Sequence, residues 1–396
     1  MLSNAAPPSV AQASDAPGRS TPDAKIRIRD CRVLRDDRVV LDVQALDIPD
    51  ALTTALIGPN GAGKSTLLRV LQLLIEPENG ELLLDGTPMR RDPIATRRRM
   101  ATAFQEPRLL SMSVRRNLEV GLRLRGVPRA QRRERAQHWL DRFGVGHLAD
   151  RHAHDVSGGE AQRVSLARAF ALEPEVLLLD EPFASLDAPT RAELIEDFAS
   201  VLAERRPATV LVTHDRDEAL RLGDRIVVLI DGLVRQEGPP AEVFGAPADA
   251  EVAAFVGVEN VWPAELEQTA AGIATYRIAG QSIDVASASP PAFALVCLRP
   301  EEITLFPPTD AAPGSARNRL AARVEAISPA GPVLRLRLSL NADEGGSDPV
   351  GAVLPNAVAT VTPASVEALG LEVGSPVAAV FKATAAHLIP TGNRAG

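Results

Sequence analysis

The chain has 396 residues, enough for two or three domains that each bury a hydrophobic core. Its 45% hydrophobic and 24% charged residues are typical of a soluble globular protein, and its net charge of −8 argues against a general nucleic-acid binder. Cys31 and Cys297, the two cysteines, fit a reducing compartment without a disulfide framework, and no apolar stretch approaches the roughly 20 residues of a membrane-spanning helix.

The N-terminal segment, residues 1–24, is rich in Ala, Pro and Ser. Because it has neither a basic start nor an apolar core, it predicts a disordered tail rather than a signal peptide. From Lys25 onward, Ile26, Ile28 and residues 39–48 alternate apolar and polar positions. This alternation predicts antiparallel strands with one buried face.

A glycine-rich loop then fits the pattern G-x-x-x-x-G-K-[ST], between the apolar run 54–57 and a helix expected to extend to about Ile75. In such a loop, glycines let backbone N–H groups turn inward around a β-phosphate. Lys64 would bring positive charge to the β and γ oxygens, and the Ser65 hydroxyl would ligate Mg²⁺. The alternative is a plain turn from strand to helix. The predicted phosphate-binding residues are Gly58, Pro59, Asn60, Gly61, Ala62, Gly63, Lys64, Ser65 and Thr66.

Residues 112–150, which follow Gln105, look helical and strongly basic. A nucleic-acid surface is one interpretation of this cluster. Apolar faces that include Leu118 and Leu140, and interleaved acids such as Glu134, favour a solvated or partner-facing helix surface instead. The arginines are Arg115, Arg116, Arg123, Arg125, Arg129, Arg132, Arg133 and Arg135.

The next helix opens with Ser157-Gly158-Gly159-Glu160 and should continue to about Leu172. Ser at the N-cap with Glu three residues later predicts a capping box. Adjacent glycines before a helix also leave N–H groups exposed for a phosphate, and position alone does not decide between the two roles.

Two apolar runs predict strands buried on both faces of a parallel sheet. The first, 176–179, ends at Asp180 and Glu181, where ligands bind in open α/β sheets. The second, 209–213, ends at His214, for which we favour a functional role. After Phe255, short alternating segments with Pro- and Gly-rich joints predict a small β-barrel.

Taken together, these ordered motifs resemble the ATP-binding-cassette ATPases over residues 25–245. The resemblance implies an α/β P-loop NTPase domain with a helical subdomain at about 106–157, followed by a smaller all-β, OB-like domain at 255–396. It implies ATP and Mg²⁺ as cofactors, with Asp180 acting on the metal and Glu181 as general base. The other implied site residues are Gln105 as the Q-loop glutamine that reaches the metal and water, His214 at the γ-phosphate and Asp187 at the dimer seam.

In this family the Ser157–Glu160 loop binds the γ-phosphate of ATP held by a second subunit, so a head-to-tail homodimer is implied. The resemblance also implies a membrane permease dimer contacted by the basic helices, and indirectly an extracytoplasmic solute-binding protein. The expected location is peripheral, on the cytoplasmic face of the inner membrane, and no nucleic-acid partner is expected.

Two features depart from the family pattern. Glu160 stands where a glutamine is usual, which resembles molybdate-type import ATPases. No aromatic residue precedes Phe104, so the usual adenine-stacking ring is missing; Leu34 or Val39, or else Arg35 or Arg38, would take its place.

The tail resembles two regulatory modules. Residues 298–303 resemble the arginine-proline-glutamate segment of β domains on import ATPases, and 315–390 resemble a molybdate-binding Mop-type module. A plain dimerisation barrel without anion ligands is the alternative. The candidate oxyanion donors are Ser315, Arg317, Asn318, Lys382 and Thr384.

The expected function is that of the ATP-hydrolysing subunit of a bacterial importer for molybdate or tungstate, slowed when the cytoplasmic oxyanion binds its tail. Three alternatives stay open at this point. The solute could be sulfate, iron, a sugar or a polyamine; the chain could be a soluble cassette ATPase acting on DNA or ribosomes; or it could be a non-catalytic oxyanion store or sensor.

Overall fold

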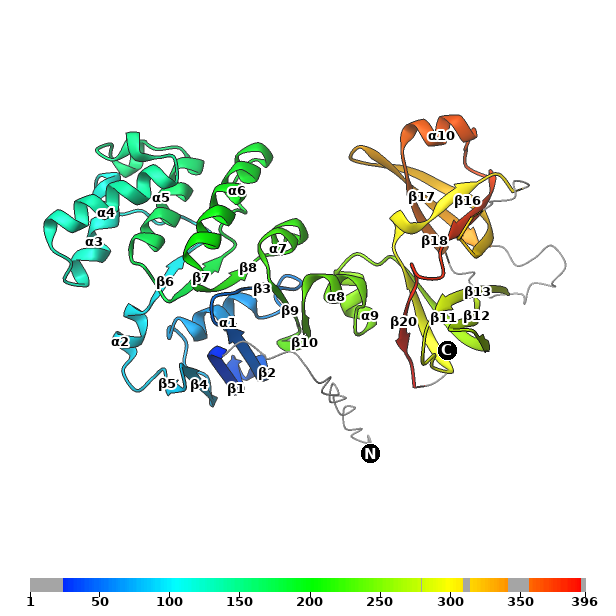
Figure 1. The fold of residues 1–396 in the computed structure, drawn as a ribbon, viewed down its shortest axis with the longest axis horizontal. Coiled ribbons are helices and arrows are strands. Elements are labelled where there is room, and N and C mark those ends of the chain that lie inside the picture. Colours follow the sequence, from blue (N-terminus) through cyan, green and yellow to red (C-terminus); the bar gives the residue numbers. More distant parts are fainter. Residues whose placement is uncertain (1–23, 279, 309–313, 341–355, 393–396) are drawn as a thin grey trace.

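The computed structural model describes residues 24–278, 280–308, 314–340 and 356–392 (Figure 1). The predicted tail at 1–24 therefore lies outside the described residues, except for Ala24, which begins the first strand. The expected α/β fold followed by an all-β part is confirmed. Within the described ranges, no helix combines the length and apolar character that crossing a membrane requires.

Two sheets build the first part of the chain. One is antiparallel, with the order β2-β1-β4-β5, and the other has the order β10-β9-β3-β8-β7-β6, parallel except for β10. β9 and β10 form an antiparallel hairpin that turns at Asp231 and Gly232. The strands of the two sheets are β1 (Ala24–Arg35), β2 (Arg38–Pro49), β3 (Thr53–Ile57), β4 (Asn79–Leu84), β5 (Thr87–Pro88), β6 (Met100–Ala103), β7 (Val176–Asp180), β8 (Ala208–Val212), β9 (Arg225–Ile230) and β10 (Leu233–Gly238).

The helices cover both faces of the parallel sheet, as buried parallel strands require. In β7, Leu177 and Leu179 pack with the core of α3–α6, whereas Val176 and Leu178 pack with that of α1 and the antiparallel sheet. The helices are α1 (Lys64–Leu71), α2 (Pro93–Arg98), α3 (Val114–Leu124), α4 (Arg129–Arg142), α5 (Gly158–Ala171), α6 (Ala188–Arg205), α7 (Arg216–Leu222), α8 (Pro240–Gly245), α9 (Ala250–Phe255) and, in the tail, α10 (Pro363–Leu369).

Two expectations about helices were wrong. The helix after the glycine-rich loop ends at Leu71 rather than near Ile75, because Leu73 turns left-handed with φ +58° and the Ile75 amide bonds back to the Arg69 carbonyl. The tail also holds α10 where only strands were expected. Thr362 caps this helix by accepting a hydrogen bond from the Ser365 amide, and Pro363 occupies its first turn.

The tail consists of two five-stranded antiparallel sheets, β13-β12-β11-β14-β20 and β15-β19-β16-β17-β18. They share one hydrophobic core that includes Trp262, Tyr276 and Phe381. The strands are β11 (Asn260–Ala270), β12 (Ile273–Ile278), β13 (Gln281–Ala286), β14 (Phe293–Leu298), β15 (Thr304–Phe306), β16 (Asn318–Ala330), β17 (Val333–Leu340), β18 (Asn356–Val361), β19 (Pro376–Phe381) and β20 (His387–Pro390).

A smaller apolar cluster joins the two parts. Cys297 and Ile389 of the tail pack with Val243, Val252 and other residues of α7–α9 and the parallel sheet. Figure 1 shows α8 and α9 between that sheet and the tail. Arg299 adds a hydrogen bond of 2.6 Å to the Phe244 carbonyl. The tail is thus attached on the side of α8 and α9.

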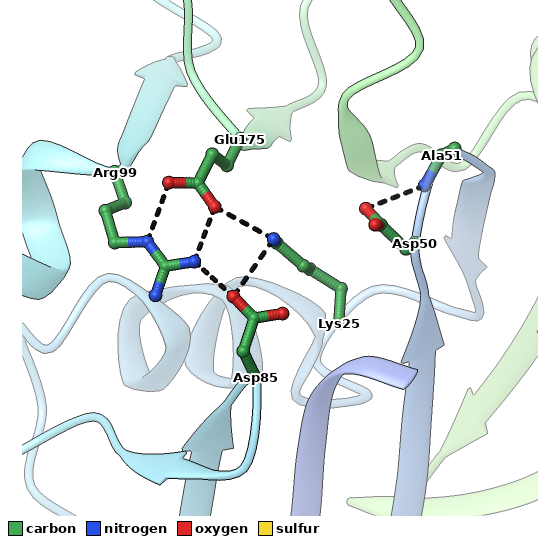
Figure 2. A network of polar contacts seen from close by, with 6 residues as sticks. All are labelled: Lys25, Asp50, Ala51, Asp85, Arg99 and Glu175. Carbon is green, nitrogen blue, oxygen red and sulfur yellow. Dashed lines mark hydrogen bonds and ion pairs between the residues drawn. The ribbon is translucent and has the colours of Figure 1, made fainter. Parts of the chain in front are cut away.

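A four-residue charge network ties the antiparallel sheet to the parallel one (Figure 2). Lys25 of β1 donates to Asp85 at 3.0 Å and to Glu175 at 2.8 Å, and Arg99, before β6, binds the same two carboxylates. Hydrogen bonding from Arg99 lowers the pKa of Glu175 to about 2. The network holds three segments that are distant in sequence at one corner of the domain.

We expect Glu175→Gln to lower the free energy of unfolding by about 1 kcal/mol at neutral pH, a small value because the Glu175 side chain is 45% exposed and its ion pairs are screened by solvent. Since the folded-state pKa is depressed, the stabilisation is present above the ordinary pKa of 4.5 and is lost as the pH falls toward 2. Urea unfolding across this range should show the difference between variant and wild type shrinking in acid. Glu76→Gln, in a pair whose acid is 77% exposed, is the control, and a pH-independent difference would contradict the assignment.

Candidate nucleotide site

Three neighbouring strands bring most of the candidate residues to one edge of the parallel sheet. β3, β8 and β7 lie side by side and run in the same direction. The glycine-rich loop follows β3, Asp180 and Glu181 come at the end of β7, and His214 comes shortly after β8. Because ligands of open α/β sheets bind beyond the carboxyl ends of the strands, this edge is the candidate site.

Two glycines of the loop are required by backbone crowding. Gly58 has φ +154°, and a Cβ there would lie 2.0 Å from the Leu229 carbonyl oxygen. Gly63, the N-cap of α1, has φ +98°, and its Cβ would lie 2.8 Å from the Val40 carbonyl oxygen. Both obstacles are main-chain atoms of adjacent strands, so only glycine lets the loop follow this path.

The Lys64 ammonium group lies inside the loop. Its Nζ donates to the Gly58 carbonyl at 2.8 Å and to the Pro59 carbonyl at 2.9 Å, and the residue is 6% exposed. Burial lowers the pKa of Lys64, and the carboxylates of Glu181 and Asp180 oppose that shift. An anionic phosphate would be a stronger acceptor for this ammonium group than two neutral carbonyls.

The Ser65 hydroxyl and the Asp180 carboxylate are adjacent. Ser65 Oγ donates to Asp180 Oδ1 at 3.2 Å. Burial raises the pKa of Asp180, whereas the hydrogen bond from Ser65 lowers it. A hydroxyl and a carboxylate oxygen placed together are hard donors of the kind that Mg²⁺ prefers.

Glu181 and His214 form a pair at the same edge. Glu181 Oε2 lies 3.1 Å from His214 Nδ1, with the glutamate side chain 19% exposed and the imidazole 56% exposed. The Glu181 amide donates to the Val212 carbonyl of β8 at 2.9 Å, which fixes the turn after β7. A carboxylate held against an imidazole, with access to solvent, is suited to accept a proton from water.

Gln105 is exposed, and its side chain makes no hydrogen bond within the described part of the chain. Asp187 caps α6 and accepts from the Thr190 amide at 3.1 Å, and this hydrogen bond lowers the pKa of Asp187. Neither side chain contacts the Glu181–His214 pair in this single chain. Both residues are exposed, and Asp187 already serves as the cap of α6.

The predicted capping box at the start of α5 is confirmed. Ser157 Oγ accepts from the Glu160 amide at 3.3 Å, and the Ser157 amide donates to Glu160 Oε2 at 2.7 Å, which lowers the pKa of Glu160. Ser157 and Gly158 are exposed, and a Cβ on Gly158 would meet no atom within 4 Å. The tip of this helix is therefore open to a ligand.

In the tail, the candidate oxyanion donors gather at one end of a ladder. β16 and β19 pair Asn318 with Phe381. Arg317, just before β16, and Lys382, just after β19, therefore lie at the same end of the two strands. The side-chain amide of Asn318 is already hydrogen-bonded within the chain. Its Oδ1 accepts from the Asp284 backbone N–H at 2.6 Å, and its Nδ2 donates to the Asp284 carbonyl at 2.8 Å. The four exposed members of the set are Ser315, Arg317, Lys382 and Thr384.

Three residues that support the site were not predicted from the sequence. Gln162 and Arg168 of α5 bind loop carbonyls near Gln105 and Glu181, and buried Glu218 accepts from the Thr213 hydroxyl at 2.6 Å, next to His214. Burial raises the pKa of Glu218. A polar residue such as Gln162 within an otherwise apolar helix face is a signal that could have revealed the first of them.

Both parts of the chain are similar to known proteins. The profile described as "ABC transporter" matches residues 41–184, and the one described as "TOBE domain" matches residues 314–388. The molybdate/tungstate import ATP-binding protein WtpC of Pyrococcus horikoshii is 34% identical over 349 residues, covering 87% of this chain and 94% of that protein. The sulfate/thiosulfate import ATP-binding protein CysA of Thermosynechococcus vestitus is 42% identical over 232 residues, covering 58% of this chain and 69% of that protein.

Among solved structures, a dimeric ATP-binding cassette in a post-hydrolysis state, bound to ADP and Pi, is similar to this fold. It is 28% identical, with a TM-score of 0.50, and the match covers 54% of this chain and 98% of that one.

Proposed function

Because the chain belongs to the family of ABC transporter ATP-binding proteins with a C-terminal TOBE domain, we propose that it is the ATPase subunit of an importer for molybdate or tungstate. The observation that carries the choice of solute is the extent of the similarity to WtpC, which spans 94% of that protein and so includes the β-rich tail. Sulfate is the second candidate, favoured by the 42% identity to CysA over a stretch about as long as the ATPase part.

ATP is the proposed substrate of the edge formed by β3, β8 and β7. The glycine-rich loop, residues 58–66, would hold its phosphates, with Lys64 exchanging two carbonyl partners for phosphate oxygens. Glu181 would accept a proton from the attacking water, and His214 would hold the carboxylate in place and contact the γ-phosphate. In this reaction the γ-phosphoryl group would be transferred directly to water, without a covalent intermediate.

Ser65 and Asp180 fit a magnesium ion, since their hydroxyl and carboxylate oxygens lie side by side. When bound, Mg²⁺ would neutralise charge on the β and γ oxygens. Gln105, at the exposed loop, is the further residue proposed to reach the metal and the water. The protein's own part is to keep Asp180 close to Ser65 at the carboxyl end of β7.

A homodimer is proposed because one chain carries a single glycine-rich loop and a single Ser157–Glu160 loop. The exposed tip of α5 in one subunit would close over ATP held by the other, with Asp187 at the seam. Partners of this dimer would be a membrane permease dimer and, through it, an extracytoplasmic solute-binding protein. The subunit would then lie at the cytoplasmic face of the membrane.

The adenine contact is proposed to be aliphatic. Leu34 and Val39 face each other in the register of β1 and β2 and are 39% and 52% exposed. The same hairpin reaches the glycine-rich loop, because the Val40 carbonyl oxygen would lie 2.8 Å from a Cβ on Gly63. Two exposed apolar side chains beside the phosphate loop would give the base a surface to pack on.

The tail is proposed to bind the transported oxyanion and to slow import. Ser315, Arg317, Lys382 and Thr384 supply charged and hydroxyl donors at one strand end, and Asn318 fixes that end through Asp284. A second copy of the tail could complete the site. Since the tail packs against α8 and α9, occupancy there could alter how the ATPase parts close.

Calorimetric titration of the full chain tests this part of the proposal. We expect molybdate and tungstate to bind, and Arg317→Ala or Lys382→Ala to weaken binding by at least about tenfold, because each removes a charged donor. Arg323→Ala, which removes an exposed arginine farther along β16, is the matched control. Binding of sulfate alone would shift the solute to the second candidate, and no binding of any of the three would reject the tail site.

A further inference from the structure

Two side chains of α5 hold the backbone on both sides of Gln105. Gln162 Nε2 lies 3.5 Å from the Phe104 carbonyl oxygen, immediately before it. Arg168 donates to the Pro107 carbonyl at 2.8 Å and to the Arg108 carbonyl at 3.1 Å, just after it. The ends of the loop are thus fixed to α5, whereas Gln105 between them is exposed.

The same glutamine also holds the turn that carries Glu181. Gln162 Nε2 donates to the Pro182 carbonyl at 2.5 Å, one residue beyond the proposed general base. The residue is fully buried, and its Oε1 has no partner among the described residues. A buried unpaired oxygen is unfavourable, so an apolar side chain would be more stable at this position. The glutamine is therefore explained only if its Nε2 donor has a function.

Arg168 is bound in an equally specific way. Burial lowers its pKa, and its guanidinium group binds main-chain carbonyls and no carboxylate of the described residues. The carbonyls are those of Pro107 and Arg108, in the loop after Gln105. An arginine placed in this way serves the position of the loop rather than an ion pair.

We infer that Gln162 and Arg168 are positioning residues for ATP hydrolysis, which make α5 the element that sets Gln105 and Glu181 relative to each other. The inference rests on the proposed ATPase function. Helix α5 begins at the Ser157–Glu160 loop, which is proposed to touch the partner's ATP. A displacement at that end of the helix is transmitted by Gln162 to both loops at once.

The test is steady-state ATP hydrolysis by the full chain carrying Gln162→Met, a substitution that keeps the size of the side chain and removes its donors. We expect kcat to fall by about 10- to 100-fold, because small misplacements of reacting groups have effects of this size, with KM for ATP within about threefold of wild type. Gln72→Met is the matched control, since Gln72 is also buried with an unpaired Oε1 but contacts neither loop. Both variants should melt at similar temperatures.

A second variant keeps the inference testable if Gln162→Met folds poorly. Arg168→Met should also lower kcat, and Arg168→Lys should lower kcat less because it retains a donor. The double variant Gln162→Met/Arg168→Met should lower kcat by less than the product of the two single-variant factors. Unchanged kcat in both single variants, or an equal loss in Gln72→Met, would overturn the inference. An inactive wild-type chain, or a Glu181→Gln chain as active as wild type, would instead overturn the proposed function.

Discussion

Glu181→Gln is expected to lower kcat for ATP hydrolysis by at least about 100-fold while leaving ATP affinity close to that of wild type. The substitution preserves the shape of the side chain and removes its capacity to take a proton. An amide can still lie 3.1 Å from His214 Nδ1, so the turn after β7 should keep its position. Binding of ATP depends on the separate loop at 58–66, which the substitution does not touch.

Radiometric or coupled hydrolysis assays, together with nucleotide titration, measure both quantities on the same preparation. Glu173→Gln is the matched control, because Glu173 pairs with Arg135 at 2.9 Å, is 44% exposed and lies outside the site. Hydrolysis by Glu181→Gln within about threefold of wild type would remove this residue from the role of general base. Loss of ATP binding would show that the side chain supports the loop instead.

Gly58→Ala has the second largest expected effect. Its Cβ would lie 2.0 Å from the Leu229 carbonyl oxygen, on the backbone of β9, where no flexible side chain can give way. We expect a loss of about 3 kcal/mol in the free energy of unfolding and no ATP binding, because the loop must move away from β9. The wild-type chain should gain about 2.7 kcal/mol at ATP concentrations 100 times Kd, and the variant should gain none.

Thermal melting with and without Mg-ATP measures this effect. Gly86→Ala is the control: Gly86 also has positive φ, at +72°, but a Cβ there meets no atom within 4 Å. It should cost about 1 kcal/mol and leave the ATP-induced stabilisation intact. A Gly58→Ala chain that ATP stabilises as strongly as wild type would contradict the structural role given to this glycine.

The position of the candidate nucleotide-binding residues at one edge of the parallel sheet was predictable because its signals are local. The apolar run of β7 has no polar alternation, which indicates a strand buried on two faces and places Asp180 at the ligand-binding edge. The capping box of Ser157 and Glu160 is likewise contained in four residues. Where the residues that form a feature follow one another within a few positions, the sequence alone predicts that feature.

Local signals were misleading or overlooked elsewhere. The apolar residues from Leu71 to Ile75 favour a longer helix, and only the left-handed turn at Leu73 ends it. The helix α10 had its own start signals, Thr362 and Pro363, but they were outweighed by the alternating segments around them. A turn with positive φ at a leucine has no signature in composition or periodicity.

Long-range contacts were beyond sequence reasoning. Gln162 binds carbonyls 58 and 20 residues away in the chain, and carbonyl groups carry no residue identity. The hydrogen bonds between the Asn318 side chain and the Asp284 backbone were equally hidden, since they depend on how β13 lies beside β16. From the sequence, Gln162 looked like an ordinary polar position and Asn318 like an oxyanion donor; the tertiary structure supplied their partners.

The central claim is that ATP joins two copies of the chain, each contributing one side of the pocket. Light scattering of the Glu181→Gln protein measures this directly, since the bound nucleotide would persist. In saturating Mg-ATP, with the permease present if required, the ATPase subunit should associate as a pair with twice its mass of 42.0 kDa, and without nucleotide it should return to single copies. A subunit that binds ATP under those conditions yet stays single would contradict the account.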